Sequence, residues 1–336
     1  MPQRSSKQKQ RQKWNSFTSE EYKAAAGMHM GTPLSCLQPH IGKPIRNHPN
    51  CAQLAVDPHG FNVALIKGIK GGDVQGNHNG ICRTLSEGLT NAGIPHTGGA
   101  TDTGPKAVFR GAIPQNLPPN DANDNKINSI IADLVVNLNN SATEPLGGAK
   151  HLVDVKTLGP GQSHHLATTS FADAVKNKAK QVDREYNKTA DSLDARLHRT
   201  LAEEKGPFAK ILREYNNGKV VVPVVDFFGA TSEDMIHLRD AIAHELARSH
   251  IDLYRTPAAQ AIGLHKQMLN RLWGHIFARG WARLILNRVR DHKETETITD
   301  EATSQNSTKN SSSTTQTSEL EPSEYRGPFS TTFPNS

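Results

Sequence analysis

Two short apolar runs, each with an acidic residue inside it, constrain the fold of this chain more than any other feature. Residues 130–138 read IIADLVVNL and residues 151–158 read HLVDVKTL, and turn-forming residues bound both runs. Short runs of Val, Ile and Leu between turns are typical of buried strands. The sequence therefore predicts two neighbouring strands, with Asp133 in the first and Asp154 in the second.

Helical and strand-like segments alternate around this pair. Helices are predicted over residues 19–28, 80–92, 171–205 and 232–248, and further strands over 107–113 and 220–228. From residue 80 onward the order is α-β-β-β-α-β-α, which is typical of an α/β fold with a small mixed sheet flanked by helices. After Pro257 another helical stretch runs to about residue 290, with Gly280 as its expected break.

Polar residues are concentrated at the two ends of the chain. Hydrophobic residues make up only 35% of the 336 residues, which is less than in ordinary globular proteins. Residues 1–16 and 293–336 cannot bury enough apolar surface to offset their chain entropy, so both ends are expected to be disordered. Between them we predict an irregular Cys- and His-containing module over 17–77, the α/β core over 78–250 and a basic helical appendage over 251–292.

The net charge of +6 understates how basic the body of the chain is. Eight acidic and three basic residues lie from residue 291 to the end, whereas residues 254–290 hold seven basic residues and no acid. Such an excess indicates a polyanionic partner, although a solvated basic surface produces the same pattern. The candidate phosphate contacts are Arg271, Arg279, Arg283 and Arg290 on the last helix, and Lys176, Lys180 and Arg184, which share one face of the helix over 171–205.

Neither secretion nor membrane insertion is expected. The longest apolar run falls short of the ~18 residues of a membrane-spanning helix, and the basic N-terminus lacks the apolar core of a signal peptide. Three cysteines do not make a disulfide framework, which predicts an intracellular, reducing location and leaves nuclear delivery open. No Cys-x-x-Cys pair occurs among the cysteines and histidines of residues 36–82, so bound zinc is not expected there.

The acids of the two central strands carry the clearest chemical signal. Residues i and i+2 of a strand lie on one face, so Asp154 and Lys156 point the same way, and an adjacent strand can bring Asp133 beside them. Two converging carboxylates need a cation between them, and oxygen ligands suit Mg²⁺ or Mn²⁺. Lys156 can then orient or deprotonate an attacking water. Solubilising charges at strand ends are the alternative, because Asp-x-Lys occurs three times in this chain.

One strand carries an acid, the next carries an acid-x-lysine, and a helix with Glu87 precedes both. This pattern resembles the PD-(D/E)xK restriction-like nuclease superfamily. The chain is also similar to the C-terminal endonuclease region that follows reverse transcriptase in non-LTR-type retroelements. The segments that carry this likeness lie in order along roughly residues 17–290. They are FTSEEYKAAAGMHMGTPL, CAQLAVDPHG, His78, IIADLVVNL, HLVDVKTLGPG, VVVPVVDFFG and LNRLWGHIFARGWARLILNRV.

This resemblance implies a restriction-endonuclease-like core of order α-β-β-β-α-β and metal-dependent hydrolysis of DNA phosphodiester bonds. It implies that Asp133, Asp154 and the carbonyl of Val155 hold Mg²⁺ or Mn²⁺, that Lys156 serves the attacking water, and that Glu87 is a further catalytic candidate. DNA is the expected partner, RNA is a second polyanion of the same class, and a retroelement reverse transcriptase is an expected associate.

The chain departs from the family pattern in two places. Ala132 stands where the motif has proline, and the zinc knuckle that often precedes the nuclease core is incomplete. The incomplete knuckle, together with the absence of a polymerase module, favours a second hypothesis, a catalytically decayed or domesticated nucleic-acid-binding protein of the same fold. A structural protein with no nucleic-acid role is the third hypothesis.

Overall fold

The structure is a computed structural model. It describes residues 16–45, 55–65, 73–98, 112–118, 131–138, 150–160, 170–249 and 257–307, with side chains up to residue 290. Contacts divide the chain into two units, residues 1–292 and 293–336. Of the second unit, only the helical residues 293–307 are described. The sheet and the apolar clusters described below all belong to the first unit.

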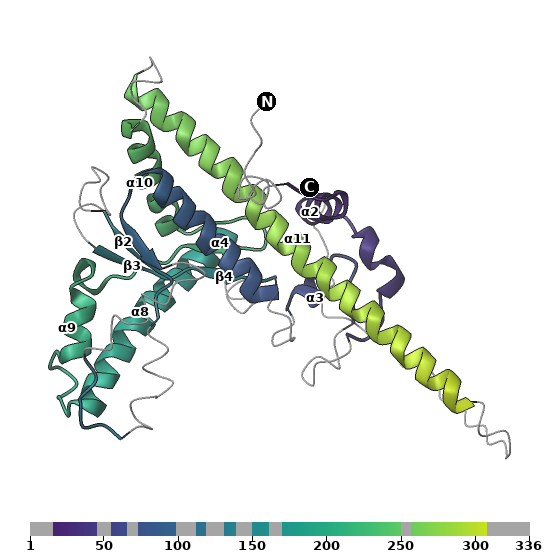
Figure 1. The fold of residues 1–336 in the computed structure, drawn as a ribbon, viewed down its shortest axis with the longest axis horizontal. Coiled ribbons are helices and arrows are strands. Elements are labelled where there is room, and N and C mark those ends of the chain that lie inside the picture. Colours follow the sequence, from purple (N-terminus) through teal and green to yellow (C-terminus); the bar gives the residue numbers. More distant parts are fainter. Residues whose placement is uncertain are drawn as a thin grey trace, which may run out of the picture. The chain divides into compact units, whose positions relative to one another are not determined.

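A small mixed sheet forms the centre of the first unit (Figure 1). Strands β1 (His96–Gly98), β2 (Leu134–Asn137) and β3 (Lys150–Val153) pair antiparallel in that order. Strand β4 (Lys156–Leu158) pairs parallel with β5 (Val224–Asp226). A bridge between Val153 and Val221 links the two parts of the sheet. The extended segment 150–158 therefore changes its neighbour, from β2 to β5, at residues 154 and 155.

Helices cover both faces of this sheet. Helices α4 (Asp73–Asn91) and α10 (Glu233–Ser249) share an apolar cluster with Val153 and Val155 on one face. Helices α8 (Phe171–Leu197) and α9 (Pro207–Arg213) share a second cluster with Leu152 and Leu158 on the other face. The two sets alternate along the segment as strand geometry requires. The prediction of a mixed α/β fold with a small sheet flanked by helices is thus confirmed.

A third apolar cluster connects the N-terminal segments with the last helix. Helix α2 (Ser19–Met30) starts with a capping box between Thr18 and Glu21, and it is followed by η1 (Ser35–His40) and α3 (Phe61–Leu65). Side chains of residues 34–64 pack against Trp281 and Ile285 of α11 (Ala258–Ser307). The described parts of residues 17–77 are therefore held to α11 by an apolar core.

The first strand of the sheet differs from the prediction. We expected it over residues 107–113, but Ala112 and Ile113 form a helical turn and a bend, and residues 107–111 lie outside the described residues. The observed strand β1 is a three-residue segment, His-Thr-Gly, directly after α4. It belongs to the sheet through its register with β2, in which His96 pairs with Val136.

Two helices also differ from the prediction. Helix α11 passes through Gly280 without a break and continues to Ser307, although we predicted an end near residue 290 and a disordered tail from residue 293. The missing side chain of Gly280 leaves room for Asn77 of α4. Helix α8 ends at Leu197 rather than near residue 205. Close to that end, the buried Asp194 accepts the first two N–H groups of α9 at 2.9 Å each. The chain then passes through η4 (Asn216–Gly218) into β5.

Candidate metal centre

Asp133, Asp154 and Lys156 lie together where segment 150–158 changes its neighbour. Continuing the β2–β3 register, in which Leu134 pairs with Val153, places Asp133 opposite Asp154. The ammonium of Lys156 donates to Asp154 Oδ1 at 2.6 Å, with the Asp154 side chain 4% exposed and that of Lys156 35% exposed. The structure therefore brings the three predicted side chains together, with the lysine toward solvent.

The backbone of Val155 bonds to side chains instead of neighbouring strands. The N–H groups of Asp154 and Lys156 donate to carbonyls of the segment that leads into β5. Between them, the N–H of Val155 donates to Asp133 Oδ2 at 2.8 Å, and its carbonyl accepts from His78 Nε2 at 3.2 Å. The change of strand neighbour thus leaves a carbonyl oxygen close to a carboxylate, and both are ligand types that divalent cations use.

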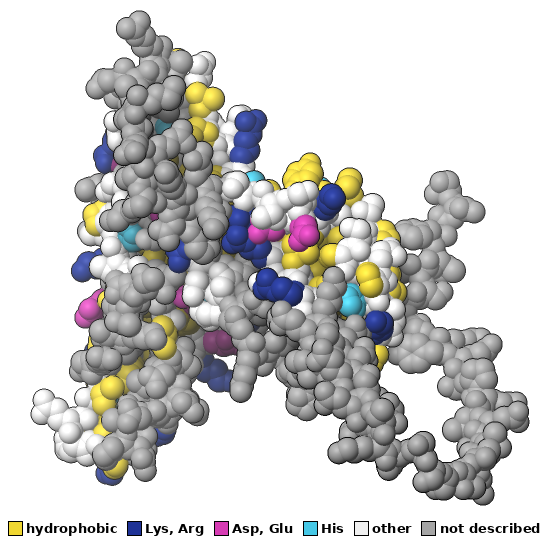
Figure 2. Space-filling view, turned by 45° about the vertical axis from the view of Figure 1, so that its right-hand side comes forward, with side chains coloured by type: hydrophobic (Ala, Val, Ile, Leu, Met, Phe, Trp, Pro, Cys, Tyr) yellow, Lys and Arg dark blue, Asp and Glu magenta, His cyan; other side chains and the backbone are white. Residues whose placement is uncertain are grey.

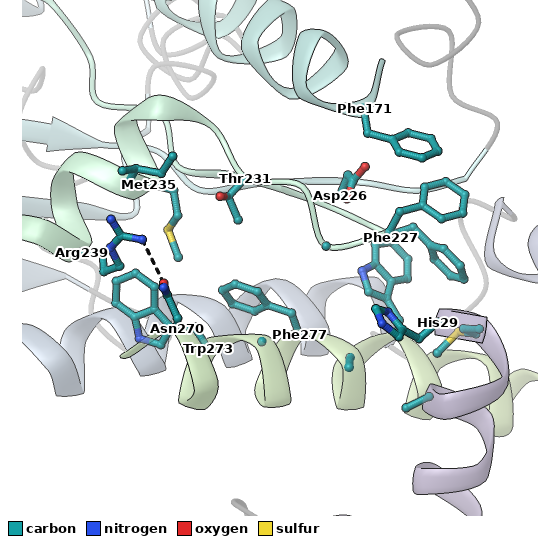
Figure 3. A pocket seen from close by; sticks show the side chains of 18 residues that line it. His29, Phe171, Asp226, Phe227, Thr231, Met235, Arg239, Asn270, Trp273 and Phe277 are labelled. Atoms are coloured by element: carbon teal, nitrogen blue, oxygen red, sulfur yellow. Dashed lines mark hydrogen bonds between the residues drawn. The ribbon is translucent and has the colours of Figure 1, made fainter. Parts of the chain in front are cut away.

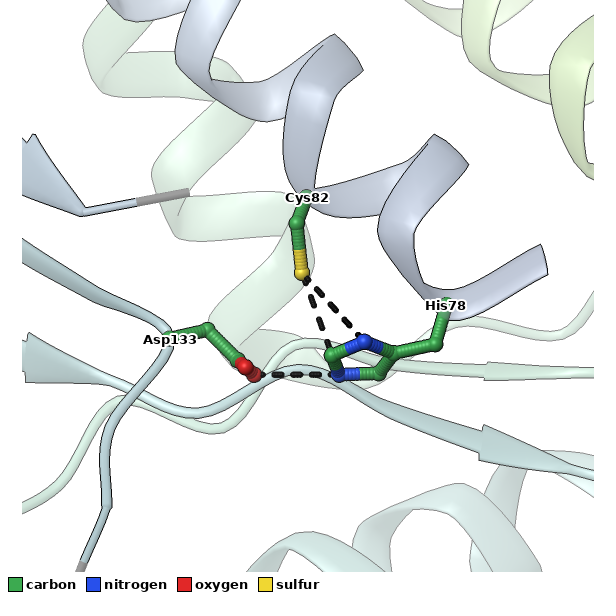
Figure 4. Close-up of side chains that lie close together, drawn as sticks. All are labelled: His78, Cys82 and Asp133. Atoms are coloured by element: carbon green, nitrogen blue, oxygen red, sulfur yellow. Dashed lines mark hydrogen bonds and ion pairs between the residues drawn. The ribbon is translucent and has the colours of Figure 1, made fainter. Parts of the chain in front are cut away.

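Helix α4 adds two side chains that we did not predict as site residues (Figure 4). His78 Nε2 lies 3.1 Å from Asp133 Oδ2, and the sulfur of the buried Cys82 lies 3.8 Å from both ring nitrogens. Burial opposes the charged imidazolium, but the hydrogen bonds with Asp133 and Cys82 raise the pKa of His78 to about 11. Burial raises the pKa of the Cys82 thiol. His78 is therefore a cation paired with Asp133 at neutral pH.

The two carboxylates have opposite pKa shifts. Burial favours the neutral form of both, but the hydrogen bond and charge of His78 outweigh burial at Asp133, so the pKa of Asp133 is lowered. At Asp154, burial and the charge of Asp133 outweigh the attraction of Lys156, and the pKa rises to about 6. Burial and the charge of Asp154 also raise the pKa of Tyr186 on α8 well above its usual value. The site thus holds one firmly ionised and one weakly acidic carboxyl group.

The donor atoms fit a divalent metal ion. His78, Cys82 and Asp133 each place one ligand atom within 4.8 Å of the others, and no other group of three or more His, Cys, Asp and Glu residues does so in the part of the chain that is described. The carbonyl of Val155 adds an oxygen 3.2 Å from His78 Nε2. Asp154 lies beside this group and bonds to Lys156.

Glu87 does not join the site. It is exposed on α4, nine residues after His78, which corresponds to about 13 Å along the helix. The α4 residue that faces Asp133 is His78. One signal for it was available in the sequence, since His78 and Cys82 are spaced i, i+4 and therefore share one face of a helix. Apolar spacing predicted the helix over 80–92, and His78 entered the prediction only as the start of the core helix in the family likeness, with no role in the site.

The four predicted arginines of α11 occupy different environments. Arg279 is 4% exposed and donates to Glu21 of α2 at 2.9 Å, and Arg283 donates to the same carboxylate. Arg279 is therefore part of the packing between α2 and α11, and as a buried side chain it is not placed to contact phosphate. Arg271 and Arg290 are exposed, but the 19 residues between them correspond to about 28 Å of helix.

The basic residues of α8 lie on its exposed side. Lys176, Lys180 and Arg184 are all exposed, whereas Tyr186 is buried and its hydroxyl donates to the carbonyl of Ile131 at 2.6 Å. Helical geometry places the three basic residues about 80–160° around the helix from Tyr186. The structure therefore does not bring them to the carboxylates. On the face seen in Figure 2, the described basic side chains lie in separate groups.

A cavity of about 740 Å³ lies beyond the end of β5 (Figure 3). Asp226, among its lining residues, pairs in register with Leu158, four residues after Asp154, which is about 13 Å along the strand. The aromatic residues of the lining are Phe171, Phe227, Phe228, Trp273, Phe277 and Trp281. Aromatic faces bind flat groups by stacking, so the cavity is distinct from the carboxylate site in both place and chemistry.

Comparison of the chain with protein-family models, with curated proteins and with solved structures finds no match. Function is therefore inferred below from the geometry of the site. Among the described residues, no helix combines the length and the apolar character needed to cross a bilayer.

Proposed function

We propose that this protein is a metal-dependent DNA endonuclease with a restriction-endonuclease-like core, related to the endonuclease region of non-LTR-type retroelements. The observation that carries the proposal is the juxtaposition of Asp133, Asp154, Lys156 and the carbonyl of Val155 at one break in the sheet. Of the three Asp-x-Lys tripeptides, this is the one that follows an acid-bearing strand of the sheet.

The order of elements supports the same proposal. Helix α4, the strands β1 and β2, the extended segment 150–158, helix α8 and strand β5 follow one another along the chain. This order is α-β-β-β-α-β when β3 and β4 are counted as one strand, with α9 and η4 inserted before β5. The first three strands pair antiparallel and the last pairs parallel, so the two acids come from an antiparallel pair.

The residues divide the chemical work between them. Asp133, Asp154 and the carbonyl of Val155 would hold Mg²⁺ or Mn²⁺. A bound divalent ion stabilises the charge that develops on the phosphate. Lys156 adds positive charge where the attacking water loses its proton, because its ammonium is anchored on Asp154 and is still partly exposed to solvent.

DNA binding rests on the exposed basic residues alone. Lys176, Lys180 and Arg184 on α8 and Arg271 and Arg290 on α11 are exposed, whereas Arg279 is excluded by its burial. Cationic side chains that contact phosphates release counterions, so the logarithm of affinity is expected to fall by about 0.9 per phosphate contact for each unit of log salt.

A second candidate function is nucleic-acid binding without cleavage. The observation that favours it is that both carboxylates already have cationic partners within the chain, His78 for Asp133 and Lys156 for Asp154. A decayed or domesticated nuclease can keep such pairs because they stabilise buried carboxylates without a metal ion.

The two functions are separated by incubating supercoiled plasmid with the purified full chain in Mg²⁺, Mn²⁺ or EDTA. The test variant is Asp154→Asn, which keeps the shape of the side chain. The matched control is Asp191→Asn, since Asp191 pairs with Lys205 at 3.0 Å but lies at the surface.

The nuclease proposal predicts nicking that needs the metal and is lost in Asp154→Asn but not in Asp191→Asn. Binding of the plasmid by Asp154→Asn should stay within a few-fold of the wild type. Salt-sensitive binding with no nicking by any variant would support the second function, and equal nicking by Asp154→Asn would move the active site elsewhere.

A further inference from the structure

The ring of His78 contacts the two oxygen atoms that would coordinate the proposed metal ion. Its Nε2 is 3.1 Å from Asp133 Oδ2 and 3.2 Å from the carbonyl oxygen of Val155. In an octahedral site, two neighbouring ligands at about 2.1 Å from the ion are about 3.0 Å from each other. His78 Nε2 therefore already has ligand-to-ligand spacing to each of the two oxygen atoms, although hydrogen bonds hold the ring there now.

An ion bound to both oxygens has to either displace this ring or bind it. The ring is confined, because the His78 side chain is only 20% exposed and Cys82, on the next turn of α4, lies against it. Its other nitrogen lies 3.4 Å from Asn79 Oδ1. Coordination by Nε2 releases the proton of that nitrogen to solvent and keeps the ring in this place, whereas displacement gives up all of these contacts.

The sulfur of Cys82 packs against the ring of His78, 3.8 Å from both of its nitrogens. An ion on Nε2 lies along the lone pair of that nitrogen, so the sulfur holds the ring in place and is not itself a ligand. Imidazole ligands favour borderline ions such as Co²⁺ and Zn²⁺, whereas Mg²⁺ takes oxygen ligands almost alone. The donor that α4 supplies is thus of a different class from those of the strands.

We propose that His78 is a metal ligand, and that the centre formed by His78 Nε2, Asp133 and the Val155 carbonyl prefers Co²⁺ and Zn²⁺ to Mg²⁺. The inference rests on the proposed function in that it names the ion of the same site. It changes the expectation drawn from the sequence, which was Mg²⁺ or Mn²⁺ held by oxygen atoms only.

The test measures metal binding and not cleavage. Co²⁺, Zn²⁺ and Mg²⁺ are each titrated into the metal-free full chain by calorimetry, for the wild type, His78→Asn and the control His29→Asn, whose histidine is exposed on α2. We expect the wild type and the control to bind one equivalent of Co²⁺ or Zn²⁺ at least tenfold more tightly than Mg²⁺. In His78→Asn, the affinity for Co²⁺ and Zn²⁺ should fall at least tenfold while that for Mg²⁺ stays within threefold.

Two other results would overturn the assignment. A rise in affinity for all three ions in His78→Asn would mean that the ring blocks the site and has to leave it. Unchanged affinity would mean that these ions bind elsewhere. If His78→Asn does not fold, His78→Gln is titrated in its place, with the same expected and contrary results.

Failure of this inference is distinguishable from failure of the nuclease proposal. Metal-dependent nicking together with unchanged Co²⁺ and Zn²⁺ affinity in His78→Asn would keep the nuclease and remove His78 from the metal site. Tight Co²⁺ binding that depends on His78, without nicking in any metal, would keep the metal site and remove the nuclease.

Discussion

The ion pair between Glu21 and Arg279 offers a sharp test of how the N-terminal helix is held. Glu21 on α2 is 5% exposed and accepts from Arg279 Nε at 2.9 Å, and it also accepts from Arg283. These hydrogen bonds and the charge of Arg283 lower its pKa despite burial. We change Glu21 to Gln, which keeps the shape and an acceptor oxygen but removes the charge.

The expected cost follows from burial. Two unit charges at about 4 Å interact by about 4 kcal/mol at an effective dielectric constant of 20, and breaking a buried pair costs roughly 3–5 kcal/mol because a charge loses its partner. Arg283 is 39% exposed, so its share is at most about 1 kcal/mol. Because glutamine still accepts a hydrogen bond, we expect Glu21→Gln to lose about 3 kcal/mol of unfolding free energy.

Urea denaturation measures this loss. The matched control is Glu20→Gln, which removes the same charge from an exposed neighbour in the same helical turn and should change stability by less than about 0.5 kcal/mol. In a Glu21→Leu background, Arg279→Met should restore stability, because no buried charge is then left without a partner. A loss below about 1 kcal/mol in Glu21→Gln, or one equal to the control, would refute the structural role of Arg279.

Three further predictions concern stability. Burial raises the pKa of Asp226 to about 6, so the folded chain holds this proton more tightly than the unfolded chain. The unfolding free energy should therefore fall by up to about 3 kcal/mol between pH 4 and 7. Urea titrations of Asp226→Asn across that range should lack this decrease. Gly280→Ala places a methyl group against Asn77 and should cost about 1–3 kcal/mol in thermal unfolding, whereas Gly274→Ala, with open space around it, should not destabilise. Asp194→Ala leaves two buried N–H groups of α9 without their acceptor and should cost about 2–4 kcal/mol by urea denaturation; a smaller loss than that of the surface variant Asp191→Ala would contradict it.

Apolar runs predicted most of the fold, and tertiary contacts decided the rest. The runs at 130–138 and 151–158 became strands because each can bury one or both faces. The three residues of β1 have no such pattern, and their pairing with β2 makes them a strand. Gly280 weakens a helix in isolation, but in the folded chain it is where Asn77 of α4 packs against the backbone of α11.

The site was predictable on the strands and not on the helices. Alternation along a strand places Asp154 and Lys156 on one face whatever packs above them. The α4 residue that reaches Asp133 depends instead on the rotation of α4 against the sheet, which has no local signature, so we selected Glu87 where the structure places His78. In the same way, the count of arginines on α11 did not show that Arg279 meets a carboxylate 258 residues away.

The change of strand neighbour explains why these residues can act together at all. Val155 points into the cluster with α4, whereas Leu152 and Leu158 point into the cluster with α8, so Asp154 and Lys156 face α8. In a continuous sheet, side chains of opposite faces are kept apart by the backbone between them. Here the pairing with β2 ends at Val153, and His78 contacts Asp133 and the Val155 carbonyl at the edge that β2 no longer covers. The site therefore requires the break in the ladder as much as its acidic residues, and inserting one residue after Val155 would turn Lys156 away from Asp154 without removing either charge.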